Sequence, residues 1–140
     1  MAGTVEQIAV SAEESALPAT VDHVEVGASG IAGDRHAKRG DITLIEAEAL
    51  EAFTEETGIP LTHEESRRQV LTRGIRLNDL VGKRFTVGEV EVVGRELCEP
   101  CRHLQSLTRQ GVLKGMVHRA GLNADIVTPG GIAVGDRVGG

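Results

Sequence analysis

Glycine occurs 18 times in this chain of 140 residues and is spread along its whole length. Between the glycines lie short segments in which apolar and polar residues alternate, such as Thr4–Val10 and Thr20–Val26, which a polar turn around Leu17-Pro18 separates. Alternation of period two is typical of half-buried β-strands, and glycine supplies the backbone conformations that tight turns need. The sequence therefore predicts many short strands joined by tight turns.

A β-hairpin is predicted in Arg84–Val92, because the alternation changes phase there. Phe85 and Val87 share one face, and Val90 resumes the pattern after Gly88-Glu89. A two-residue turn with glycine in its first position explains this change of phase.

Two helical segments interrupt the strands. Glu46–Thr57 is rich in Ala and Glu, and Gly58-Ile59-Pro60 ends it. Thr62-His63-Glu64-Glu65 has the form of a capping box and predicts one further turn. Further strands are expected at Asp41–Ile45, at Gln69–Thr72 and in the tail, Ile132–Val138. Because βα alternation is absent from this order, we expect a mainly β (α+β) single domain, residues 1–140: a β-barrel of short strands decorated with two or three helices.

Composition excludes several classes of partner. Aromatic residues make up 1% of the chain, so the core is expected to consist of Val, Ile, Leu and Ala, and base stacking is not available for nucleic-acid binding. The net charge of −6, from 15 basic and 21 acidic residues, also argues against nucleic acid. No apolar run approaches the roughly 18 residues of a membrane span, and no signal peptide is visible. The expected compartment is the cytoplasm, with no membrane or nucleic-acid partner.

Both cysteines occur in the phrase Cys98-Glu99-Pro100-Cys101, where a strand pattern gives way to a helix pattern that runs toward Leu107. Pro100 suits a first helical turn, since that position needs no N–H donor. Cys101 would then face the free N–H groups of this turn, with Arg102-His103 beside it. A helix N-terminus lowers the pKa of a thiol from its usual value of about 8.5, which makes Cys101 the candidate nucleophile or metal ligand.

Four interpretations of this phrase compete. In the first, Cys98 is a small buried hydrophobe at the strand end and Cys101 is an inert neighbour, since free cysteines are often buried and inert. In the second, the two cysteines form a dithiol–disulfide couple, which is expected within a βαβ pattern, and none follows here. A zinc site needs two more ligands, and the five histidines are isolated, so zinc is discounted. In the fourth interpretation one thiolate binds a soft metal or carries a persulfide sulfur. The residues alone leave the inert, redox and thiolate-site interpretations open.

Basic residues gather in the glycine-rich segment Gly27–Gly40, which contains Arg35, His36, Lys38 and Arg39. The segment is neither a P-loop nor a dinucleotide fingerprint. Its backbone N–H groups and positive charges would suit a phosphate, although a solvated turn with ordinary surface charges is the more common explanation. Two further basic pairs are Arg67-Arg68 and His118-Arg119, and neither pair means much by itself.

The motifs of this chain follow a characteristic order. They are Gly30-Ile31-Ala32-Gly33-Asp34-Arg35-His36, Thr43-Leu44-Ile45, Arg67-Arg68-Gln69-Val70, Leu80-Val81-Gly82 with Val87-Gly88, Leu97-Cys98-Glu99-Pro100-Cys101, and Arg119-Ala120-Gly121-Leu122 with Val134-Gly135-Asp136. From about Gly3 to Val138 this order resembles the MOSC domain, the module named for the C-terminal part of molybdenum cofactor sulfurase. Each motif is weak singly, and their joint order and spacing are specific.

The resemblance implies a MOSC-type β-barrel and the pterin-bound molybdenum cofactor (molybdopterin) as ligand or cargo. In amidoxime-reducing relatives the second cysteine of the phrase is the molybdenum ligand, and in sulfurase-type relatives it is proposed to carry sulfur; that position is Cys101 here. The family's arginine before the central strand, Arg67 or Arg68 here, would face the cofactor's phosphate. Gln69 stands where the family usually has Asn, which puts its role in doubt. The candidate cofactor-binding residues are Arg35, His36, Arg67, Arg68, Gln69 and Arg119.

The sequence is therefore interpreted as a small stand-alone MOSC protein of a bacterial or archaeal cytoplasm. Through Cys101 it would transfer sulfur or reduce N-hydroxylated substrates, with a cysteine desulfurase or a molybdoenzyme as partner. Pyridoxal phosphate belongs to a fused desulfurase domain of the family, and none is expected in this chain. The alternatives are a non-catalytic cofactor carrier or chaperone, and a thiol-redox module that uses Cys98 and Cys101.

Overall fold

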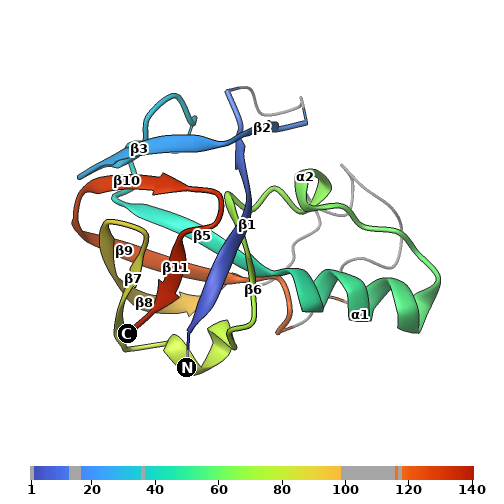
Figure 1. Cartoon of the computed structure of the whole chain (residues 1–140). Helices are drawn as coiled ribbons and strands as arrows, with labels where there is room; N and C mark the ends of the chain where they lie inside the picture. The colour runs from blue at the N-terminus through green and yellow to red at the C-terminus, as the bar shows by residue number, and fades with distance from the viewer. Residues whose placement is uncertain (1, 13–16, 36, 99–115, 117) are drawn as a thin grey trace.

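A computed structural model describes residues 2–12, 17–35, 37–98, 116 and 118–140 of the chain (Figure 1). Its strands are β1 (Gly3–Val10), β2 (Ala19–Val21), β3 (His23–Gly27), β4 (Gly30–Ile31), β5 (Asp41–Glu46), β6 (Val70–Arg73), β7 (Arg84–Val87), β8 (Val90–Leu97), β9 (Leu122–Thr128), β10 (Gly130–Ala133) and β11 (Arg137–Gly139). Its helices are α1 (Ala47–Thr57), α2 (His63–Ser66) and the 3₁₀ turn η1 (Leu77–Leu80). None of these described helices is long and apolar enough to span a membrane.

Seven strands close into a barrel in the order β11-β7-β8-β9-β5-β6-β1. Pairing between β1 and β11, through Gly3 and Val138, completes the ring, and β2 continues the sheet beside β1. A separate sheet, β10-β3-β4, lies across one end of the barrel (Figure 1). The mainly β, barrel-type fold predicted from the sequence is confirmed.

The barrel interior is filled by aliphatic side chains from alternate strand positions. Ile42 and Leu44 of β5 and Leu122 and Ala124 of β9 point inward and are fully buried, whereas Thr43, between the first two, lies on the outer face. A second apolar cluster lies under α1, where Phe53 packs with Ile45, Leu71 and Met116 on the outside of the barrel wall. The outer face of β5 and β9 beyond α1 carries polar residues.

The helix ends predicted from the sequence are confirmed. Gly58 ends α1 in the left-handed conformation, with φ of 73°, and its N–H donates to the Thr54 carbonyl. Thr62 caps α2 in a complete capping box with Glu65. Together α1 and α2 connect β5 to β6, which are parallel, so the chain contains one βαβ crossover that sequence periodicity did not reveal.

The predicted hairpin of β7 and β8 is confirmed, with Val87 opposite Val90 and Gly88 at φ of 60°. Thr20–Val26, predicted as one strand, is divided at Asp22 into β2 and β3, which belong to different sheets. The C-terminal segment also contributes strands to two sheets, because β10 pairs with β3 while β11 pairs with β7 and β1. Strand β9 was not predicted, and the helix expected from Glu99 toward Leu107 lies outside the described residues.

Candidate functional site

Polar side chains form a row on the outer face of the barrel, across β8, β9 and β5 and the residue that precedes β6. Thr43 of β5 is directly opposite Asn123 of β9, which in turn is opposite Glu96 of β8. Gln69, just before β6, continues the row beyond Thr43 through hydrogen bonds. The row lines a pocket of about 350 Å³, a size that suits a small-molecule ligand.

Gln69 and Thr43 extend the parallel ladder of β5 and β6 by one step. The Thr43 N–H donates to Gln69 Oε1 at 2.9 Å, and the Gln69 N–H donates to Thr43 Oγ1 at 2.9 Å. Gln69 is buried, so these bonds fix its amide group within the wall of the pocket. Gln69 departs from the Asn that is usual in the family at this position. In this fold its side-chain oxygen accepts a hydrogen bond from the Thr43 N–H.

Arg67 and Arg68 follow α2 and line the same pocket. Arg67 adopts the left-handed conformation, with φ of 62°, at a helix end where glycine is the usual residue. Arg68 Nε donates to the Ala120 carbonyl at 2.6 Å, which ties its guanidinium to the chain segment that leads into β9. Both side chains are half-buried, so they present positive charge where solvent screening is reduced.

Arg35 approaches Arg67 from the glycine-rich segment. The Arg35 N–H donates to the Ser11 carbonyl at 2.8 Å, and buried Asp34 accepts the Ser11 N–H at 3.0 Å, so this turn is attached to the end of β1. Burial, and then the charge of Arg35, lower the pKa of Arg67. Two guanidinium groups whose positive charges repel each other in this way provide a suitable location for an anion. His36 lies outside the described residues.

Cys98 lies at the wall of the pocket as a protonated thiol. Its N–H donates to the Gly121 carbonyl at 2.8 Å, and its Sγ–H donates to Asn123 Oδ1 at 3.1 Å. Burial raises the pKa of the Cys98 thiol above its ordinary value, although the charge of Arg68 opposes this shift. A thiol in this state is a poor nucleophile at neutral pH. Cys101, the predicted reactive residue, lies outside the described residues.

The acidic side of the pocket is partly neutralised by Arg95. Asp41 is buried, and its Oδ2 is 2.7 Å from Arg95 Nη2, while Asp125 lies 3.2 Å from Arg95 Nη1. Arg39, which the sequence grouped with the basic turn, also lines the pocket. The arrangement can therefore hold an anionic group at its arginine side and accept hydrogen bonds at its carboxylate and amide side.

Arg119, the remaining candidate, lies outside this pocket. Its Nη2 pairs with Glu56 of α1 at 2.9 Å, and it lines a different pocket near the start of α1. Sequence reasoning missed Asn123, because the strand that carries it was not predicted. Among the described residues no group of three or more His, Cys, Asp or Glu side chains is arranged to hold a metal ion.

Comparisons with solved structures identify relatives of this fold. The YUAD protein from Bacillus subtilis matches with a TM-score of 0.87 and 17% identity, over 99% of this chain and 95% of that chain. YiiM from Geobacillus stearothermophilus matches with a TM-score of 0.77 and 16% identity, over 99% and 75%. YiiM from Escherichia coli matches with a TM-score of 0.71 and 16% identity, over 99% and 69%. At such identities the likeness concerns the fold alone.

A comparison with curated protein sequences gives no match. The family model of the MOSC domain, in contrast, matches residues 33–139. This match includes β5 to β11 and all residues that line the pocket of Thr43 and Asn123. Because it covers most of the chain, and the architecture agrees with it, the protein belongs to the MOSC domain family.

Proposed function

We propose that this protein binds the molybdenum cofactor, or a related phosphorylated pterin, in the pocket between Gln69 and Glu96. The observation that carries the proposal is the pair of half-buried arginines, Arg67 and Arg68, beside a row of amide and hydroxyl groups that hydrogen bonds fix in position. Guanidinium groups suit a phosphate, and the polar row suits the hydrogen-bonding edge of a pterin ring. Membership of the MOSC family supports the same ligand class.

Cys101 is the proposed protein ligand or sulfur carrier. It follows Cys98 by three residues, so the extended chain limits the separation of their Cα atoms to about 11 Å. Cys98, at the pocket wall, is the protonated hydrogen-bond donor to Asn123 and has a packing role in this proposal. The bound cofactor would supply a thiophilic metal centre for sulfur exchange or for reduction of an N-hydroxylated substrate.

A cofactor carrier is the main alternative, and a dithiol couple is the other. In C-x-x-C redox proteins the attacking thiol has a depressed pKa; burial raises the pKa of Cys98, so in such a couple Cys101 would have to be the attacking thiol. A catalyst turns over a substrate after it is loaded with cofactor, and a carrier only transfers the cofactor to a partner. For either role we propose a cytoplasmic setting, with a cysteine desulfurase or a molybdoenzyme as the partner.

The first experiment tests cofactor binding. Elemental analysis of the purified protein should find molybdenum, and oxidation should release a fluorescent pterin. Arg67→Ala should weaken binding of a phosphorylated pterin by about 1.5–3 kcal/mol, the value expected for a charge-assisted hydrogen bond. Arg84→Ala is the matched control, since Arg84 is exposed and pairs with Glu91 away from the pocket. Equal binding by both variants would contradict the proposed site.

The second experiment tests the division of labour between the cysteines. Alkylation at a series of pH values should show Cys101 reacting faster than Cys98, with a pKa below about 8.5. Cys101→Ser should abolish cofactor-dependent activity at a nearly unchanged melting temperature, and Cys98→Ser should retain most of it. Equal loss in both variants would favour the dithiol couple, and full activity in Cys101→Ser would remove the central residue of the proposal.

A further inference from the structure

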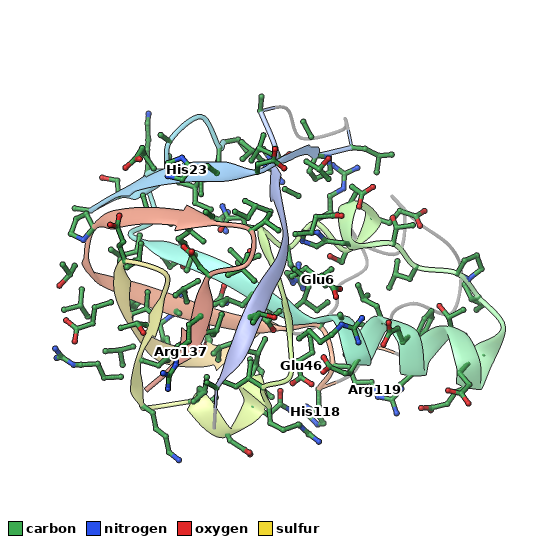
Figure 2. The ribbon with its side chains drawn as sticks, in the orientation of Figure 1. Glu6, His23, Glu46, His118, Arg119 and Arg137 are labelled. Atoms are coloured by element: carbon green, nitrogen blue, oxygen red, sulfur yellow. The ribbon has the colours of Figure 1, made fainter. Side chains whose placement is uncertain are left out.

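A second pocket, of about 330 Å³, lies at the opposite end of β5. It is lined by the first two turns of α1 with Glu46 before them, by η1 and the residue before it, and by the turn at His118-Arg119. Figure 2 shows Glu46, His118 and Arg119 close together near the N-terminal end of α1. None of its lining residues belongs to the pocket proposed for the cofactor. It is therefore a separate site, and the proposed function does not use it.

Two carboxylates of this pocket are fixed in position by backbone amides. The Leu77 N–H donates to Glu46 Oε2 at 3.0 Å, and the Gly74 N–H donates to Glu48 Oε2 at 2.7 Å. Each carboxylate thereby has one oxygen hydrogen-bonded to the chain between the end of β6 and the first residue of η1. Such fixed acceptors lose little conformational entropy when they bind a donor.

The second oxygen of Glu46 can accept a hydrogen bond from a ligand in the pocket. Glu46 Oε1 is 3.9 Å from Arg76 Nε, which is too long for a hydrogen bond, although its side chain is only 14% exposed. Glu48 Oε1 also accepts no hydrogen bond from the described part of the chain, but it is buried, so a ligand in the pocket does not reach it and Glu48 contributes its charge. Burial also raises the pKa of Glu46, as expected for a carboxylate with too few donors.

The charges around the pocket leave one negative charge in excess. Arg119 is paired with Glu56 at 2.9 Å, so the remaining formal charges are those of Glu46, Glu48 and the exposed Arg76. Alanine side chains at positions 49 and 52 leave space for a short apolar body. We propose that this pocket binds a small primary ammonium compound, which donates an N–H to the free oxygen of Glu46 and lies beside the negative charge of Glu48.

The amides of Gly74 and Leu77 provide a direct readout, because each donates to one of the two carboxylates. Propylammonium chloride, titrated into the full chain and followed by ¹H–¹⁵N NMR, should shift both resonances in a saturable way. Tetramethylammonium has the same charge without N–H donors and should leave them unshifted. Glu46→Gln should weaken binding about tenfold or more, because the buried acceptor loses its charge.

Three further variants complete the test. Ala52→Leu keeps every charge and fills the pocket, so it should abolish the shifts even if Glu46→Gln disturbs folding. Glu55→Gln, on the exposed side of α1, should bind like the parent protein. Arg67→Ala should also bind normally, which separates this site from the proposed cofactor pocket. Non-saturable shifts, equal shifts with both cations, or normal binding by Ala52→Leu would overturn the proposal.

Discussion

Arg67 combines an unfavourable backbone conformation with a proposed ligand contact, so that its replacement by glycine should relieve the backbone strain while it removes function. The residue has φ of 62° and ψ of 17° at the end of α2, where a side chain is strained and glycine is not. Its guanidinium is half-buried and lies near that of Arg35. Strain that persists in this way is typical of functional sites. The informative comparison is between Arg67→Gly and Arg67→Ala.

Both variants lose the guanidinium, so the difference between their free energies of unfolding reports the backbone contribution alone. Alanine retains the left-handed strain, about 1–2 kcal/mol, whereas glycine avoids it and loses about 0.5–1 kcal/mol through the larger entropy of its unfolded chain. The free energy of unfolding should therefore be higher for Arg67→Gly than for Arg67→Ala by about 0.5–1 kcal/mol. For a domain of this size that corresponds to a melting temperature higher by about 2–4 °C.

Scanning calorimetry measures the two melting temperatures, and titration calorimetry with a phosphorylated pterin measures binding. Binding should weaken in both variants to the same extent, by about tenfold or more. If Arg67→Gly melts at or below the temperature of Arg67→Ala, the left-handed backbone is not a source of strain. If either variant binds like the parent protein, Arg67 does not contact the phosphate.

Three further predictions concern stability. Gly121→Ala should destabilise the protein by at least about 2 kcal/mol in denaturant melts, because the new Cβ would clash with the Leu44 carbonyl oxygen. Gly82→Ala is the control: its Cβ would have no atom of the described residues within contact distance, so only about 1 kcal/mol of stability should be lost, to backbone strain. Thr62→Ala should cost about 1 kcal/mol through loss of the capping box, measured in the same way. Burial lowers the pKa of His63, so below about pH 6.5 the unfolded chain binds a proton that the folded chain does not, and the free energy of unfolding should fall. Thermal melts at pH 7 and pH 5 measure this loss of stability, which should be smaller in His63→Gln than in the parent protein. An equal loss in both proteins would contradict the prediction.

Local signals in the sequence predicted most of the elements that depend on neighbouring residues. The hairpin at Gly88-Glu89, the end of α1 at Gly58 and the capping box at Thr62 are all confirmed, because each is decided within a few residues of chain. Strand β9 was missed, since its second half, from Asp125 onward, is half-buried or exposed and lacks a clean alternation. The division of 20–26 at Asp22 also had no local signal.

The residues of the candidate site were also predicted only in part from the sequence. Arg67, Arg68 and Gln69 were selected from the sequence as cofactor-binding candidates, and the structure places all three at one pocket. Asn123 and Thr43 were not selected, because only strand register brings them opposite each other. Arg119 was selected with the first group and lies at the second pocket, since its pairing with Glu56 depends on where α1 packs.

The sequence by itself determined the mainly β architecture, the aliphatic core and the MOSC family, because periodicity, turn residues and motif order are properties of the chain. Only the tertiary structure decided which strands pair, where the barrel closes through β1 and β11, and which polar residues share a pocket. Those outcomes depend on contacts between residues far apart in the chain, such as Thr43 with Asn123 and Arg68 with Ala120. Such contacts form only when the whole barrel closes, and no local pattern encodes them.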